Sequence, residues 1–138
     1  MRYDKTVRLA DGRALRIRSA EALDAEAVCD LFTRTHGQTD YLLAYPEENS
    51  FTVEQEGDFL QRLLESNREV MLLSEVDGDL CACASVCAVG AKYKIRHRAE
   101  FGISVDKSFW GLGVGKALTQ AAIDCAKEAG YRQLELDV

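Results

Sequence analysis

Three glycines occupy alternate positions in the stretch SVDKSFWGLGVGKAL, which covers residues 104–118. Gly111, Gly113 and Gly115 follow an apolar segment typical of a strand and come just before a helical pattern. Glycine permits positive φ angles and close approach of a ligand to the backbone, and the first turn of a helix presents N–H groups that bind anions. The spacing therefore favours a cradle for phosphate, although a glycine-rich turn that packs a helix tightly against a strand would need the same residues.

Two well-known phosphate-binding patterns do not match this stretch. A triphosphate-binding loop has four residues between its first glycine and a Gly-Lys pair, and then a hydroxyl residue for magnesium. Here three residues separate Gly111 from Gly115, and Ala117 replaces the hydroxyl residue, which disfavours triphosphate hydrolysis. A dinucleotide-binding fingerprint requires a further glycine where Lys116 stands. Because Asp137 ends the next predicted strand, as a ribose-binding acid would, dinucleotide binding stays an alternative.

Glu100 is the candidate for proton transfer. It lies in the predicted strand RAEFGISV, residues 98–105, which leads toward the glycines. A carboxylate can take a proton from an amine, directly or through a water molecule. A surface charge paired with Arg98 or Lys92 would explain the same residue, so both interpretations stay open.

Three cysteines, Cys81, Cys83 and Cys87, alternate along one predicted strand and are expected on one face of it. Zinc sites usually combine two closely spaced pairs of cysteine or histidine. No second cluster stands near these three, and His36 and His97 are isolated in the sequence. We therefore expect no metal site and no cysteine nucleophile, and the thiols should be buried as small apolar side chains.

The elements that must position these residues follow from turn, cap and periodicity signals. In the first half of the chain we expect two strands around the turn Asp11-Gly12, a helix over residues 24–35, and a second helix that begins with a capping box at Thr52 and Gln55. Strands 69–76 and 80–89 should follow, joined by the turn Asp77-Gly78. The chain should then continue with strand 98–105, a helix over residues 113–129 and strand 133–138. The apolar stripe of the first helix should comprise Leu23, Ala27, Val28, Leu31 and Phe32, with Asp24 as its cap.

The last strand, helix and strand form a crossover, so these two strands should be parallel, whereas hairpins make their strands antiparallel. We thus predict an α/β fold of the α+β type, with a mixed, mostly antiparallel sheet flanked by helices. A single domain spanning residues 1–138 is expected from the length of the chain.

Composition restricts the classes of function. The chain has 138 residues, 47% of them hydrophobic, and a formal net charge of −6 from 17 basic and 23 acidic residues. An acidic chain is a poor candidate for nucleic-acid binding, its charged N-terminus lacks a signal-peptide core, and no apolar run is long enough to cross a bilayer. Five cysteines, an odd number, fit unbridged thiols in a reducing compartment. We expect a cytoplasmic protein with no nucleic-acid or membrane partner.

The segment VDKSFWGLGVGKAL, residues 105–118, resembles the acetyl-coenzyme A signature of the GNAT superfamily of N-acetyltransferases. That signature is a strand followed by Arg or Gln, two residues, Gly, one residue, and Gly or Ala at a helix start. Trp110 stands at the Arg/Gln position, which is a departure from the pattern, while Gly113 and Gly115 stand at the two small-residue positions. The order of elements over residues 14–138 is similar to that of the family as well.

The resemblance implies acetyl-coenzyme A as cosubstrate and no metal. Its pyrophosphate would bind to the backbone amides of Trp110, Gly111, Leu112, Gly113, Val114, Gly115 and Lys116, and its pantetheine arm to the backbone of Ile103, Ser104 and Val105. The thioester would lie in a gap between residues 103–105 and 134–138, with Glu100 as general base toward the amine. The segment that holds Asp40, Tyr41, Tyr45, Glu47 and Glu48 would lie near the acceptor, or it is a solvated loop.

In the family, the strand that matches residues 134–138 is followed by a helix and two further strands. Because the sequence ends at Val138, we expect a domain that lacks this C-terminal part and has an edge strand that can pair two copies into a homodimer. The predicted function is transfer of an acetyl group from acetyl-coenzyme A to a primary amine of a small molecule, protein or peptide. The alternative is a non-catalytic module that binds coenzyme A or a nucleotide.

Overall fold

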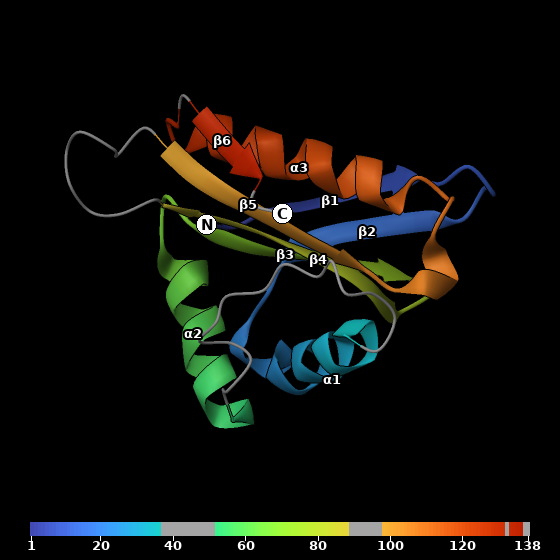
Figure 1. Cartoon of the computed structure of the whole chain (residues 1–138), viewed down its shortest axis with the longest axis horizontal. Coiled ribbons are helices and arrows are strands. Elements are labelled where there is room, and N and C mark those ends of the chain that lie inside the picture. The colour runs from blue at the N-terminus through green and yellow to red at the C-terminus, as the bar shows by residue number, and fades with distance from the viewer. Residues whose placement is uncertain (37–51, 89–97, 132, 137–138) are drawn as a thin grey trace.

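The computed structural model describes residues 1–36, 52–88, 98–131 and 133–136. They form one six-stranded sheet with helices on both faces (Figure 1). The strands are β1 (Asp4–Arg8), β2 (Ala14–Ser19), β3 (Val70–Val76), β4 (Asp79–Ala88), β5 (Arg98–Val105) and β6 (Gln133–Leu136). The helices are α1 (Ala25–His36), α2 (Val53–Glu65) and α3 (Val114–Glu128), with short 3₁₀ turns η1 (Ala22–Asp24) and η4 (Lys107–Phe109).

The strands lie in the sheet in the order of the chain. Neighbours from β1 to β5 are antiparallel, and β6 runs parallel to β5 because α3 carries the chain back along the sheet. The hairpins turn at Gly12, with a φ of 92°, and at Asp77 and Gly78, with φ of 54° and 83°. These left-handed conformations are the ones that an Asp-Gly pair supplies. The predicted mixed, mostly antiparallel sheet flanked by helices is confirmed.

One face of the sheet is covered by α3 (Figure 1). The buried residues of this helix are Val114, Leu118, Ala121, Ala122, Cys125 and Ala126. Such small side chains let the helix lie close to the sheet, and strand residues beneath it, such as Leu15 and Leu72, are fully buried. Because Val114 is the first residue of α3, its burial fixes the glycine segment relative to the sheet.

The other face is covered by α1 and α2 (Figure 1). The capping box of α2 forms as predicted: the hydroxyl of Thr52 accepts the N–H of Gln55 at 3.1 Å, and the side chain of Gln55 accepts the N–H of Thr52 at 3.0 Å. The core on this face includes Val28, Leu31, Leu60, Leu63, Met71 and Leu73.

The entry into α1 differs from the prediction. The chain forms η1 before the helix, and Leu23, predicted in the apolar stripe, is 95% exposed there. A 3₁₀ turn has three residues per turn, so it does not continue the face of an α-helix. Asp24 lies within η1 and is not the N-cap of α1: its carboxylate accepts the N–H of Glu21 at 2.7 Å and forms an ion pair with Arg18 at 2.7 Å. Of the other stripe residues, Val28, Leu31 and Phe32 are buried, and Ala27 is exposed.

Cys81 does not share a face with Cys83 and Cys87, contrary to the prediction. Cys81 packs in the core under α3, whereas Cys83 and Cys87 pack in the core under α1 and α2. The pairing of β3 with β4 shifts between Ser74 and Glu75, which leaves Cys81 as an extra residue in β4. A β-bulge of this kind interrupts the alternation of side chains. All three thiols are buried, as predicted.

Candidate active site

The segment that joins β5 to α3 is anchored by Asp106. Its backbone N–H donates to the carbonyl of Cys81 in β4 at 2.8 Å, and its buried carboxylate accepts the N–H of Ser108 at 3.0 Å, which makes it the N-cap of η4. The N–H of Trp110 then donates to the carbonyl of Lys107 at 3.2 Å. This bond already uses one of the amides that were predicted to bind pyrophosphate. The Asp-x-Ser spacing is a local cap signal that could have identified Asp106 from the sequence.

The three glycines differ in why they are needed. Gly111 and Gly113 have φ angles of 81° and 91°, in the left-handed region that residues with a side chain rarely adopt, so the turn itself requires both. Gly115 lies inside α3 and outside that region. Apart from its chain neighbours, a Cβ atom on any of the three would meet no described residue within 4 Å. The backbone here is therefore open to close approach, and Gly115 is a glycine that the turn does not require.

The backbone donors lie at the start of α3. Gly113 is the N-cap, and the N–H of Ala117 donates to its carbonyl at 3.0 Å. The N–H groups of Val114, Gly115 and Lys116 come before that bond, so they have no partner within the helix. Together with the exposed side chain of Lys116, they form a positive helix end of the kind that binds phosphate. We call residues 111–116 the cradle.

The tip of the β1–β2 hairpin contacts the cradle and the turn before it, and we call these contacts the brace. The N–H of Ala10 donates to the carbonyl of Leu112 at 3.2 Å. The guanidinium of Arg13 lies 5.7 Å from the centre of the Phe109 ring, in η4, within the range of a cation–π contact. Two segments that are a hundred residues apart in the chain thus hold the turn together.

The two sides of β5 are paired over different lengths. Toward β4 the pairing extends to Val105, which lies opposite Ala82. Toward β6 the pairing of described residues ends at Phe101, opposite Leu136. Within the described ranges, residues 103–105 therefore have no strand partner on this side of β5. This open edge leads toward the cradle, which is where the pantetheine arm was predicted to bind.

The predicted gap between the strands is shorter than expected. Residues 134–136, which were expected to line it, are paired with residues 99–101. Parallel strands joined by a helix hydrogen-bond wherever their backbones are within reach, and the two strands are still adjacent at this point. Residues 137–138, which complete the predicted gap, lie outside the described residues.

The side chain of Trp110 lies at the end of β5. Its indole N–H donates to the carbonyl of Val105 at 3.0 Å, and the residue is 51% exposed. No sequence signal predicts this bond, because it depends on how η4 folds back toward the strand.

Ser104 faces the opposite side of the sheet from α3. It is 4% exposed, and its hydroxyl has no hydrogen-bond partner among the described residues. It adjoins a small cavity that Phe32, Met71 and Ser85 also line. A buried hydroxyl beside a cavity is placed to bind a water molecule or a ligand oxygen.

Glu100 is exposed on the same face of β5 as Ser104. Its neighbours Ala99 and Phe101 are buried under α3, so the alternation of a strand places Glu100 on the side of α1 and α2. It lies three positions before Ile103, which corresponds to about 10 Å along a strand. The candidate base and the open edge of β5 therefore belong to one rigid element.

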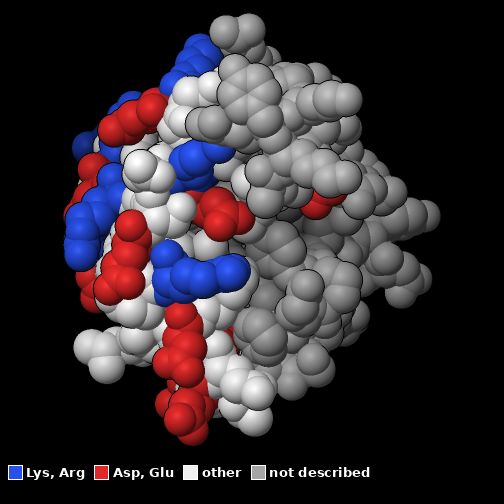
Figure 2. All heavy atoms as spheres, turned by 90° about the vertical axis from the view of Figure 1, so that its left-hand side faces the viewer, with Lys and Arg blue, Asp and Glu red and all other residues white. Residues whose placement is uncertain are grey.

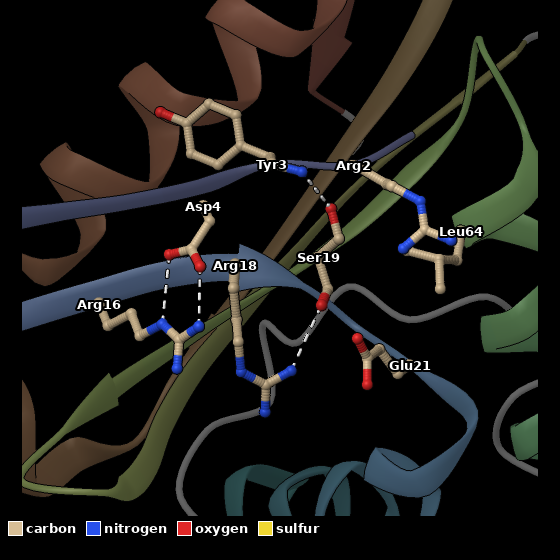
Figure 3. A pocket seen from close by; sticks show the side chains of 8 residues that line it. All are labelled: Arg2, Tyr3, Asp4, Arg16, Arg18, Ser19, Glu21 and Leu64. Atoms are coloured by element: carbon tan, nitrogen blue, oxygen red, sulfur yellow. Dashed lines mark hydrogen bonds and ion pairs between the residues drawn. The ribbon is translucent and has the colours of Figure 1, made fainter.

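A separate hollow of about 310 Å³ lies between β1, β2 and the end of α2 (Figure 3). At one side of it Arg16 forms an ion pair with Asp4 at 2.7 Å, and Arg18 is bound by both Asp24 and Glu75. These two guanidinium groups are already matched by carboxylates, which is why we place the candidate site at the cradle and not here. On the described part of the face in Figure 2, basic and acidic side chains are interspersed.

Several predicted features lie outside the described residues. These are the acceptor-side residues Asp40, Tyr41, Tyr45, Glu47 and Glu48, the alternative ribose ligand Asp137, the isolated His97, and the side chains of Lys92, Arg98 and His36. Within the described ranges, no group of three or more His, Cys, Asp or Glu side chains is arranged to hold a metal ion. No helix in these ranges is long and apolar enough to cross a membrane.

Comparison with known proteins defines the class of this protein. The sequence model described as "Acetyltransferase (GNAT) family" matches residues 25–138. The chain therefore belongs to the GNAT family of acetyltransferases, in agreement with the resemblance of its glycine segment. The match includes the cradle and β3 to β6, and it starts after β1, β2 and η1.

Solved structures, one of them from the same family, have the same fold. The acetyltransferase of GNAT family from Streptococcus pneumoniae is 28% identical, with a TM-score of 0.81 over 88% of this chain and 73% of that chain. The N-acetyltransferase from Staphylococcus aureus Mu50 is 24% identical, with a TM-score of 0.73 over 88% and 72%. The protein yncA from Salmonella typhimurium, solved with its cofactor acetyl-CoA, is 20% identical, with a TM-score of 0.70 over 85% and 65%. The last two show likeness of fold alone. A search of curated proteins gave no match.

Proposed function

We propose that this chain transfers an acetyl group from acetyl-coenzyme A to a primary amine of a small molecule, protein or peptide. Acetyl transfer is the general activity of the family to which the chain belongs. The observation that best supports cofactor binding is the cradle, where open glycine backbone, a helix N-terminus and Lys116 meet at the end of β5. No metal is required, because backbone donors and Lys116 provide the positive charge that phosphate needs.

The residues that would hold the cofactor divide into two groups. The N–H groups of residues 111–116 and the ammonium of Lys116 would bind the pyrophosphate, while the N–H of Trp110 remains bonded to Lys107. The edge of β5 at Ile103 and Val105 would bind the amides of the pantetheine arm. The backbone groups of Ser104 face β4 by alternation, so its buried hydroxyl is the group that it can offer.

Bound acetyl-coenzyme A supplies an acetyl group activated as a thioester. The residues of the chain must bring a neutral amine to that group and hold it there. We assign the removal of the amine proton to Glu100, because it is exposed on the strand that carries the open edge, and its carboxylate can act directly or through a water molecule. Positioning supplies a large part of the rate, since a fixed amine reacts in an effectively unimolecular step.

Two measurements test this function. Calorimetric titration with acetyl-coenzyme A should show binding, and an assay of thiol release should show turnover with at least one member of a panel of primary amines. Binding without thiol release for any amine would favour the alternative, a non-catalytic module that binds coenzyme A or a nucleotide. Absence of binding would contradict the proposal itself.

We also propose that residues 1–138 act as one acetyltransferase domain in the cytoplasm, without a nucleic-acid or membrane partner. A single sheet joins β1 at one side to β6 at the other, which supports one domain. The five cysteines, all of them within the described ranges, form no disulfide, which supports a reducing compartment.

A further inference from the structure

We propose that Trp110 is a gate for the pantetheine arm of coenzyme A. Its indole N–H holds the carbonyl of Val105, which is the acceptor that the arm needs, and it must release this carbonyl for the arm to bind. The inference rests on the proposed function. It concerns a position at which the chain departs from the Arg or Gln of the family signature.

The carbonyl of Val105 points toward the open edge of β5. It belongs to the same peptide group as the N–H of Asp106, which donates to Cys81 in β4 at 2.8 Å. No peptide bond in the described ranges is cis, and the C=O and N–H of a trans peptide point in opposite directions. The oxygen therefore points away from β4, toward the side on which pairing with β6 ends at Phe101.

The indole occupies the space in front of this oxygen. Nε1 of Trp110 lies 3.0 Å from the carbonyl oxygen of Val105. A carbonyl oxygen can accept two hydrogen bonds, but a two-ring side chain at this distance fills much of the space that a second donor would cross. An amide of the arm and the indole of Trp110 therefore compete for one acceptor.

The surroundings of Trp110 allow its side chain to move. The residue is 51% exposed and belongs to neither core, and the adjacent Gly111 lies in an open part of the turn. Its other neighbour, Phe109, packs against the core under α3 and lies beside Arg13. Rotation of the indole would thus break the bond to Val105 without removing a buried side chain from either core.

The first test compares two ligands in calorimetric titrations. Acetyl-coenzyme A carries the arm, whereas adenosine 3′,5′-bisphosphate carries phosphates but no arm. Trp110→Phe keeps an aromatic ring and loses the N–H. In this variant the affinity for acetyl-coenzyme A, divided by the affinity for the bisphosphate, should rise about fivefold, which corresponds to one hydrogen bond of about 1 kcal/mol. An unchanged or lower ratio overturns the gate.

Phe109→Leu is the matched control, because it alters the same turn and leaves the bond between Trp110 and Val105 in place. The affinity ratio should stay at the wild-type value in this variant. A rise equal to that of Trp110→Phe would assign the effect to general loosening of the turn and overturn the gate.

The second test follows the indole directly. Trp110 is the only tryptophan in the chain, so its indole N–H gives a single NMR signal. Acetyl-coenzyme A should shift this signal and speed its exchange with water, whereas the bisphosphate should leave its exchange unchanged. An indole N–H signal that stays protected from exchange in the complex with acetyl-coenzyme A would overturn the gate but not the proposed function. Failure of the wild type to bind acetyl-coenzyme A at all would overturn the proposed function together with the gate.

Discussion

At the scale of single residues, Gly115 is a position where a substitution should affect the proposed cofactor binding without affecting folding. It lies in α3 outside the left-handed region, and a Cβ atom there meets open space. Gly115→Val should therefore keep nearly the melting temperature of the wild type. Its affinity for acetyl-coenzyme A should fall at least about tenfold, equivalent to roughly 1.4 kcal/mol, because the side chain would project toward the phosphates. Calorimetry and thermal unfolding measure the two quantities separately.

Gly113→Val serves as the contrasting variant. Gly113 has a φ of 91°, and the left-handed conformation costs a residue with a side chain about 1–2 kcal/mol of folding free energy. Stability and affinity should therefore fall together in this variant. If Gly115→Val binds acetyl-coenzyme A as tightly as the wild type, the phosphates do not lie over the start of α3.

Glu100→Gln tests the proposed base. Turnover should fall, by roughly the 10²–10⁴-fold typical of a lost general base. The loss should be greatest at low pH, where the amine is protonated, while the affinity for acetyl-coenzyme A should hardly change. The measurement is a pH–rate profile with the best amine of the panel. Asp79→Asn, at an exposed acid in the hairpin before the site, is the control, and a wild-type profile in Glu100→Gln would reduce Glu100 to a surface charge.

At the scale of elements, α2 carries an acid in its buried stripe. Glu56 is fully buried, and neither carboxylate oxygen has a hydrogen-bond partner among the described residues. Burial raises the pKa of Glu56 from 4.5 to about 7. Since the folded protein holds this proton more tightly than the unfolded chain, the resulting stabilisation is complete below about pH 4.5 and is lost as the pH rises through 7.

Glu56→Gln removes this titration. Between pH 4.5 and 7, the free energy of unfolding of the wild type should decrease relative to that of the variant. The change should exceed about 1 kcal/mol, since one pKa unit corresponds to about 1.4 kcal/mol. Urea denaturation at each pH gives the difference. Glu54→Gln, at an exposed position in the same first turn of α2, should follow the wild type, and a Glu56→Gln variant that does so too would show that another group titrates.

Which elements could be predicted from the sequence depends on how local their signals are. The cap at Thr52, the turn at Asp77 and the strand over residues 98–105 are specified by adjacent residues, and all three form as predicted. The exposure of Leu23 and the position of Cys81 depend on η1 and on the register step between β3 and β4. Periodicity alone cannot locate either feature.

The same distinction applies to the candidate site. The helix start at Gly113 and its glycine spacing are local, so the cradle could be predicted. The bond from Trp110 to Val105 and the brace from Ala10 to Leu112 join segments whose proximity only the folded chain creates. These contacts could not have been found from sequence motifs.

At the scale of the whole molecule, the two outer strands of the described sheet differ in character. β1 has the sequence DKTVR and is mostly exposed, and charges on an edge strand discourage pairing with another chain. β6 has the sequence QLEL, with a single charge. We predict that two copies associate through β6, so sedimentation velocity should detect a dimer whose share grows with concentration. Gln133→Lys, which adds a charge to the edge strand at a position already polar, should keep the chain monomeric, whereas a wild type that is monomeric at every concentration would contradict the prediction.

The brace between the β1–β2 hairpin and the cradle also determines where the protein can be cut. Sequence similarity to the family begins at residue 25, so a fragment trimmed to that boundary would keep every residue of the cradle. It would nevertheless lose two neighbouring strands, uncover the edge of β3 and remove the partner of the Leu112 carbonyl. For anyone who shortens this protein, the start of the family match is therefore not the boundary of the folding unit, because the first 24 residues include two strands of the sheet and the hydrogen bond that holds Leu112 in the cradle.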